Sequence, residues 1–100
     1  MKKNNVEVSD IRIIPIKPKN GLVALASCIL DGKFFVSSIG IYVYAKDKTG
    51  FYLTYPTKKN DTGILRLFYP INDETANSIK TAVIDKYQEF MSSGIDDDNE

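Results

Sequence analysis

The hydrophobic period of the sequence changes once, near Asn72, and this change constrains the fold more than any other feature. Before it, short apolar runs are separated by turn residues, which is typical of successive β-strands. After it, apolar residues recur at spacings of three and four and so share one face of a helix. They are Ala76, Ile79, Val83, Tyr87 and Phe90, with Ala82 and Met91 beside them. Strands followed by one C-terminal amphipathic helix predict an α+β fold, an antiparallel sheet of about five strands with the helix packed on it.

Turn signals divide the strand region. We expect strands over residues 6–16, 22–30, 33–44, 51–55 and 64–69, with a charged turn at 45–50 and a polar loop at 57–63. The second strand is apolar on both sides, which is typical of a central strand. Asp31-Gly32 after it predicts a two-residue type I′ hairpin, because both central positions of that turn need positive φ. The small residues from Ser37 to Gly40 predict a bend or bulge that breaks the return strand in two.

The helix has signals at both ends. Asn72 or Asp73 is expected to cap its first turn, since either side chain accepts hydrogen bonds from free amides. Gly94 is expected to end it. These limits divide the chain into a flexible N-terminus at residues 1–5, one α+β domain at 6–92 and an acidic disordered tail at 93–100.

The charge is balanced overall but unevenly distributed. Lys plus Arg and Asp plus Glu both number 13, yet four of the acids lie among residues 96–100. Without those four, residues 1–95 carry a net charge of +4. The domain is therefore mildly basic, which is compatible with a polyanionic partner.

Composition argues against several kinds of function. With one cysteine, Cys28, and no histidine, the chain has neither an internal disulfide nor the usual zinc ligands, so we expect no metal site and a reducing, cytoplasmic location. No signal peptide or membrane-spanning run is indicated. Cys28 lies in an apolar strand and is expected to be a buried, inert thiol. Without histidine, paired carboxylates or a phosphate-binding glycine loop, the sequence predicts no enzyme, no cofactor and no small-molecule substrate.

The remaining candidates for chemistry are cations near the last predicted strand. Lys58, Lys59 and Arg66, with Lys80 in the helix, are expected to converge and to neutralise the phosphates of DNA or RNA. The alternative is that these cations only keep the domain soluble. The tyrosines of the predicted strands also have two interpretations. They either stack on the bases of a single-stranded nucleic acid or pack half-buried against the sheet. They are Tyr42, Tyr44, Tyr52, Tyr55 and Tyr69.

Five blocks in register carry a family resemblance. They are Val8–Arg12 (VSDIR), Leu25–Asp31 (LASCILD), Tyr55–Lys59 (YPTKK), Pro70–Asn72 (PIN) and Ala82–Tyr87 (AVIDKY). In this order, over residues 6–90, the sequence resembles the bacterial SpoVG family, named for stage V sporulation protein G and also called a septation regulator. The resemblance implies a small homodimer of sheet-plus-helix subunits that binds DNA, and in some members RNA. It also implies regulation of transcription or translation, with effects on sporulation and septum formation.

The resemblance assigns the same residues as the cationic pattern. The family's basic pair matches Lys58 and Lys59, and its following arginine matches Arg66. The chain departs from the family at the helix start, where Ala76 and Ser78 replace an arginine and a lysine, and Lys80 is basic at a position usually uncharged. These departures concern the choice of nucleic-acid site more than the scaffold.

One alternative function belongs to another class. A protein-interaction module acting in division or sporulation control, through a sheet edge or the helix, would leave the cations incidental. Salt-sensitive retention of nucleic acid distinguishes the two functions.

Overall fold

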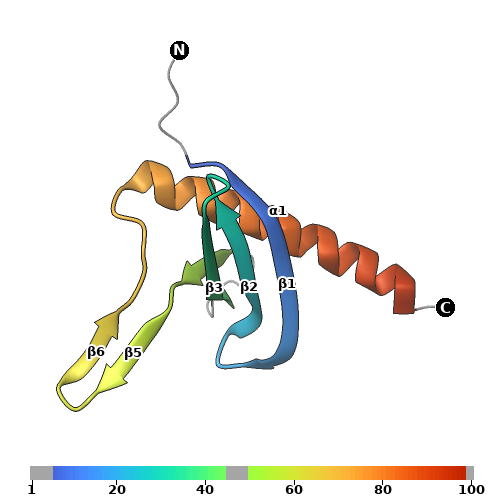
Figure 1. Ribbon diagram of the computed structural model, residues 1–100. Coiled ribbons are helices and arrows are strands. Elements are labelled where there is room, and N and C mark those ends of the chain that lie inside the picture. Colours follow the sequence, from blue (N-terminus) through green and yellow to red (C-terminus); the bar gives the residue numbers. More distant parts are fainter. Residues whose placement is uncertain (1–5, 45–49, 99–100) are drawn as a thin grey trace.

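The computed structural model describes residues 6–44 and 50–98, with side chains described through residue 92. A four-stranded antiparallel sheet in the order β1-β2-β3-β4 carries one long helix across a face, and a separate two-stranded hairpin extends away from both (Figure 1). The elements are β1 (Val8–Lys19), β2 (Leu22–Leu30), β3 (Phe34–Val43), β4 (Phe51–Thr54), β5 (Thr57–Asn60), β6 (Gly63–Arg66) and α1 (Asp73–Asp98). The predicted flexible N-terminus and the predicted charged turn up to residue 49 lie outside the described residues. The α+β fold predicted from the sequence is confirmed.

The core lies between the sheet and α1. Strand β2 is central, as predicted, because it pairs with both β1 and β3. Alternate β2 side chains are buried, and so are apolar side chains of β3 and α1 that face them. The buried set is Ala24, Ala26, Cys28 and Leu30 of β2, Val36, Ile39 and Ile41 of β3, and Ile79, Val83 and Tyr87 of α1.

The β2–β3 turn has positive φ at the two positions that the sequence predicts, but the predicted two-residue loop is wrong, because Leu30 pairs with Phe34 and leaves three residues between the strands. Asp31 and Gly32 both have positive φ, at 53° and 65°. The amide of Lys33 donates to the carbonyl of Leu30 at 2.9 Å and closes the turn. The local chemistry of two residues thus fixes the direction in which β3 returns.

Strand β3 contains the predicted bulge but is not broken by it. Ala26 pairs with Ile39 and Cys28 pairs with Val36, so β3 carries an extra residue between these pairs. Ser38 absorbs the distortion with a φ of 61°. The expectation of two strands is wrong, because a single extra residue bends a ladder that then resumes.

Strand β1 runs to Lys19, beyond the end at residue 16 that the prolines predicted. It is an edge strand, which tolerates proline because one side of an edge strand has no neighbouring strand to donate to. The ladder is irregular between Pro15 and Lys19. Proline therefore marks an edge here and not the end of the strand.

The segment from Thr57 to Asn60 corrects a larger expectation. It was predicted as loop, yet it forms β5 and pairs with β6 in a two-stranded sheet of its own. The last strand ends at Arg66 and not at Tyr69, and it does not join the main sheet, which has four strands. Strand β5 was missed because its four residues are polar and exposed. A strand without alternating apolar residues gives no hydrophobic period from which it could be predicted.

Helix α1 begins as predicted. The side-chain Oδ1 of Asn72 accepts a hydrogen bond from the amide of Thr75 at 2.8 Å, which identifies Asn72 as the cap. The predicted end at Gly94 is wrong, because α1 continues to Asp98. A single interior glycine costs a helix only about 1 kcal/mol relative to alanine and does not by itself end it. The last two residues lie outside the described residues, and the disordered acidic tail stays a prediction.

The predicted apolar face of α1 is covered only in part. Ile79, Val83 and Tyr87 are buried, but Phe90 and Met91 are 37% and 40% exposed. The helix therefore extends past the sheet at its C-terminal end, as Figure 1 shows. Among the described residues, no helix has an apolar stretch long enough to cross a membrane.

Candidate functional site

The β5–β6 hairpin brings together three of the four predicted cations. Thr57 pairs with Arg66, Lys58 with Leu65, and Lys59 with Ile64. All of these side chains are exposed. The strand register, and not sequence proximity alone, thus places Arg66 beside a lysine that lies seven positions earlier.

The two faces of the hairpin carry different side chains. Directly opposed residues in an antiparallel pair point to the same side, and neighbours along a strand point to opposite sides. Lys59, Ile64 and Arg66 therefore share one face, which we call the cationic face. Lys58 and Leu65 share the other, which we call the leucine face.

A short turn holds the tip of the hairpin. The Oδ1 of Asn60 accepts hydrogen bonds from the amide and the hydroxyl of Thr62, both at 3.0 Å. Gly63 follows with a φ of 143°, a backbone conformation that residues other than glycine rarely adopt. Asparagine and glycine thus fix the register in which Lys59 and Arg66 meet.

Aromatic packing anchors the base of the hairpin to the core. The rings of Tyr55 and Phe68, which flank the two strands, lie 6.1 Å apart and pack against the core. The amide of Leu67 donates to the carbonyl of Pro56 at 3.0 Å. Burial, with a smaller contribution from the nearby Cys28 thiol, raises the pKa of Tyr55 to about 12, so its phenol stays neutral at any physiological pH.

The cations on the hairpin are electrostatically available. In the part of the chain that the structure describes, Lys58, Lys59 and Arg66 form no salt bridge, whereas Lys86 lies 3.7 Å from Glu89 on α1. The guanidinium of Arg66 stacks over the ring of Tyr69, 3.8 Å from its centroid. Stacking covers one face of the guanidinium and leaves its N–H edge free to donate to an oxyanion.

Lys80 does not join this group. It lies on α1 and lines a pocket of about 320 Å³ with Tyr44, Phe51 and Thr81. This pocket is at the start of β4, whereas the hairpin projects from the other end of that strand (Figure 1). Of the four cations predicted to converge, three therefore lie on the hairpin, and only Lys59 and Arg66 share one face of it.

The strand tyrosines pack mostly on one another. Tyr52 stacks on Tyr42 with centroids 5.2 Å apart and lies 5.0 Å from Tyr44. Tyr55 packs against Phe68, as described above. The packing interpretation thus accounts for these side chains, although Tyr44 keeps 46% of its surface exposed.

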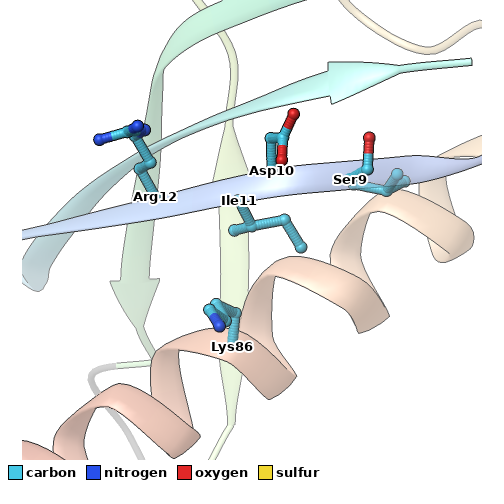
Figure 2. Close-up of a pocket in the computed structure, with 6 residues that line it drawn as sticks. Ser9, Asp10, Ile11, Arg12 and Lys86 are labelled. Carbon is cyan, nitrogen blue, oxygen red and sulfur yellow. The ribbon is translucent and has the colours of Figure 1, made fainter. Parts of the chain in front are cut away.

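A second pocket, of about 550 Å³, lies between β1 and α1 and also contains cations. Figure 2 shows Ile11 pointing toward α1 and Lys86, whereas Asp10 and Arg12 project from the other side of β1. Arg12 and Lys86 thus do not converge on one ligand.

Cys28 is fully buried, and burial raises the pKa of its thiol, so the thiolate needed for nucleophilic attack is disfavoured. No cluster of three or more metal-ligating side chains occurs in residues 6–44 and 50–98. The hairpin is therefore the strongest candidate site among the described residues.

Comparison with known proteins supplies independent findings. A family model described as SpoVG matches residues 6–89. The septation protein SpoVG of Acetivibrio thermocellus is 32% identical over 84 residues, covering 83% of this chain and 86% of that protein. The protein of the same name from Caldicellulosiruptor bescii is 31% identical over 90 residues, covering 89% and 99%. That of Clostridium novyi is 26% identical over 95 residues, covering 94% and 92%.

Proposed function

The chain belongs to the SpoVG family, and from this premise we propose that it is a non-catalytic regulatory protein that binds nucleic acid through the cationic face of its β5–β6 hairpin. The protein acts as a cytoplasmic homodimer, and its regulation affects septation or sporulation, as the names of its relatives suggest. DNA is the first candidate ligand and RNA the second.

The observation that carries the proposal is the geometry of the cationic face. Lys59 and Arg66 point to the same side of a projecting ribbon, and neither is neutralised by an acid among the described residues. Such cations displace counterions from a phosphate backbone, which gives binding that is largely independent of sequence and weakens with salt. Lys58 lies on the leucine face and contributes less.

The shape of the hairpin favours duplex DNA over duplex RNA. The major groove of B-DNA admits a two-stranded β-ribbon, whereas the major groove of A-form RNA is too narrow for side chains to read. At the groove, Arg66 would contact a phosphate on its edge or donate two of its N–H groups to the edge of a guanine. A homodimer presents two such ribbons and so doubles the number of hairpin cations that contact the DNA. This matters because the chain as a whole has no net charge.

A binding titration tests the proposal. The protein is titrated against a short DNA duplex and a single-stranded RNA at several salt concentrations, with a variant in which Lys58, Lys59 and Arg66 are all alanine. The proposal predicts affinity that falls with salt and is lost in the triple variant. Equal affinity of the two proteins would remove the hairpin from the binding site.

A second candidate function is a protein-interaction module. Phe34 and Phe35, which follow the β2–β3 turn, are 63% and 69% exposed, and such apolar surface often binds another protein. Capture of a defined division protein, together with no salt-sensitive retention of nucleic acid, would favour this function.

A further inference from the structure

Arg66 lies at the anchored end of the cationic face. It pairs with Thr57 where the two strands begin to separate, next to the hydrogen bond from the amide of Leu67 to the carbonyl of Pro56, at 3.0 Å. Lys59 lies at the other end, beside the turn at the tip, which projects away from the sheet and α1 (Figure 1). The cationic face therefore has an arginine where the hairpin is held and a lysine where it is free.

The ring of Tyr69 holds the plane of the Arg66 guanidinium. The central carbon of the guanidinium lies 3.8 Å from the ring centroid. Lys58 and Lys59 make no such contact in the part of the chain that the structure describes. A guanidinium stacked on a ring keeps its N–H groups in its own plane, where they donate as a fork. The contact thus sets the direction in which Arg66 donates.

Tyr69 is itself held by its neighbours in the chain. Phe68 before it packs against the core and against Tyr55. Pro70 after it restricts the backbone of Tyr69 to extended conformations, because the proline ring clashes with a helical residue before it. The Tyr69 side chain is not among those packed on the core, and 43% of its surface is exposed. Its ring is therefore held in place without being needed to fill the core.

Phosphates and bases make different demands on a cation. Neutralising a phosphate backbone needs charge but little orientation, because counterion release is independent of sequence. Guanine presents two acceptors, O6 and N7, side by side in the major groove, and a guanidinium meets both only when its N–H edge points at them. A side chain that is already held in that orientation avoids the entropy cost of being ordered on binding. The ring beneath Arg66 is therefore of most use to a directed contact.

We propose that Tyr69 is a positioning residue that holds Arg66 for reading guanine in the major groove of DNA. The proposal rests on the proposed nucleic-acid-binding function and adds selectivity to it. Lys59 supplies charge near the tip of the hairpin, and Arg66 distinguishes guanine from the other bases at the anchored end. Tyr69 acts only through Arg66.

Two DNA duplexes of the same sequence test this role. One contains guanine, and the other contains 7-deazaguanine, which lacks the N7 acceptor but keeps the base pairing and the charge. Fluorescence anisotropy measures both affinities at several salt concentrations. A bidentate contact to guanine contributes a factor of between about 5 and 150, so loss of one of the two acceptors should weaken wild-type binding by between about twofold and tenfold.

Three variants separate the position of Arg66 from its charge. Tyr69→Leu removes the ring and Arg66→Lys removes the fork, and both keep the cation. Each should bind the two duplexes equally, with the salt dependence of the wild type. Tyr69→Phe keeps the ring and should keep the wild-type preference for guanine. A purely structural role of Tyr69 would instead lower the affinity of Tyr69→Leu for both duplexes by the same factor.

Two outcomes would overturn the inference and leave the proposed function in place. They are a wild type that binds both duplexes equally and in a salt-sensitive manner, and a Tyr69→Leu variant that keeps the preference for guanine. A wild type that binds neither duplex would remove the function and the inference together.

A measurement on the wild type without DNA tests the stacking itself and does not depend on the folding of a variant. The Nε–H proton of Arg66 should resonate upfield of its position in the unfolded protein, because it lies over the Tyr69 ring. An unshifted signal would show that the guanidinium is not held there in solution. It would overturn the inference whichever way the DNA titrations turn out.

Discussion

Lys58 and Lys59 form a matched pair for testing which face of the hairpin binds nucleic acid. They are adjacent, carry the same charge and are both exposed. The register nevertheless places Lys59 with Arg66 on the cationic face and Lys58 on the leucine face. Replacing either with alanine changes the net charge equally, so any difference between the two variants reports on position alone.

The size of the effect follows from counterion release. In a dimer, Lys59→Ala removes two phosphate contacts, and at about 0.9 for each contact the slope of log K against log salt falls by about 1.8. The same relation gives an affinity loss of about 200-fold near 0.05 M salt and about 20-fold near 0.2 M. Lys58→Ala should change the slope by less than half as much. The Lys58 ammonium lies on the far side of the ribbon, and salt screens its attraction to the phosphates.

Fluorescence anisotropy of a labelled DNA duplex, titrated at four salt concentrations, measures both slopes. Far-UV circular dichroism and thermal melts confirm that the variants fold. Equal slopes for the two variants, or a larger change for Lys58→Ala, would refute the assignment of the cationic face.

Three further predictions concern the scaffold. Gly40→Ala places a methyl group 2.6 Å from the Oγ1 of Thr54; urea denaturation should show a loss of roughly 1–3 kcal/mol, and an unchanged midpoint would contradict this packing. Asn72→Ala removes the acceptor for the Thr75 amide; it should cost about 1 kcal/mol in the same measurement, and no loss would mean that the cap is dispensable. Burial raises the pKa of Tyr55 from 10 to about 12, so the folded state retains this proton longer than the unfolded state and loses stability as pH rises through that interval. In Tyr55→Phe the free energy of unfolding should therefore fall less steeply as pH rises through this interval than in the wild type. Identical profiles for the two proteins would show that Tyr55 does not contribute to the pH dependence of stability.

Local chemistry made much of the fold predictable. Asp31-Gly32 specified its turn because few residues tolerate positive φ, and Asn72 specified the helix start because its side chain replaces a missing backbone acceptor. The buried face of α1 through Tyr87 followed from spacing alone. Its end at Asp98 did not, since one glycine gives only a weak stop signal.

The candidate site was predictable in composition but not in shape. The sequence indicated which cations lie near each other along the chain, and Lys58, Lys59 and Arg66 do share one hairpin. It did not indicate that β5 is a strand, because its residues are polar and its backbone hydrogen bonds leave no trace in hydropathy. Without that strand, neither the separation of Lys58 from Lys59 nor the position of Lys80 outside the group could be derived.

The exposure of the apolar side chains near β6 was not predicted either. Residues 64–69 were expected to form one strand of the sheet, but β6 ends at Arg66 and belongs to a separate hairpin. Leu65, Leu67, Tyr69 and Ile71 are therefore exposed.

The most direct test of the central claim is a map of the bound surface. ¹H–¹⁵N spectra of the labelled protein are recorded while a short DNA duplex is added. The account predicts that the amides from Thr57 to Arg66 shift or broaden first, that salt reverses the change, and that α1 around Lys80 is little affected. Shifts confined to α1 or to the sheet, with the hairpin unchanged, would contradict it.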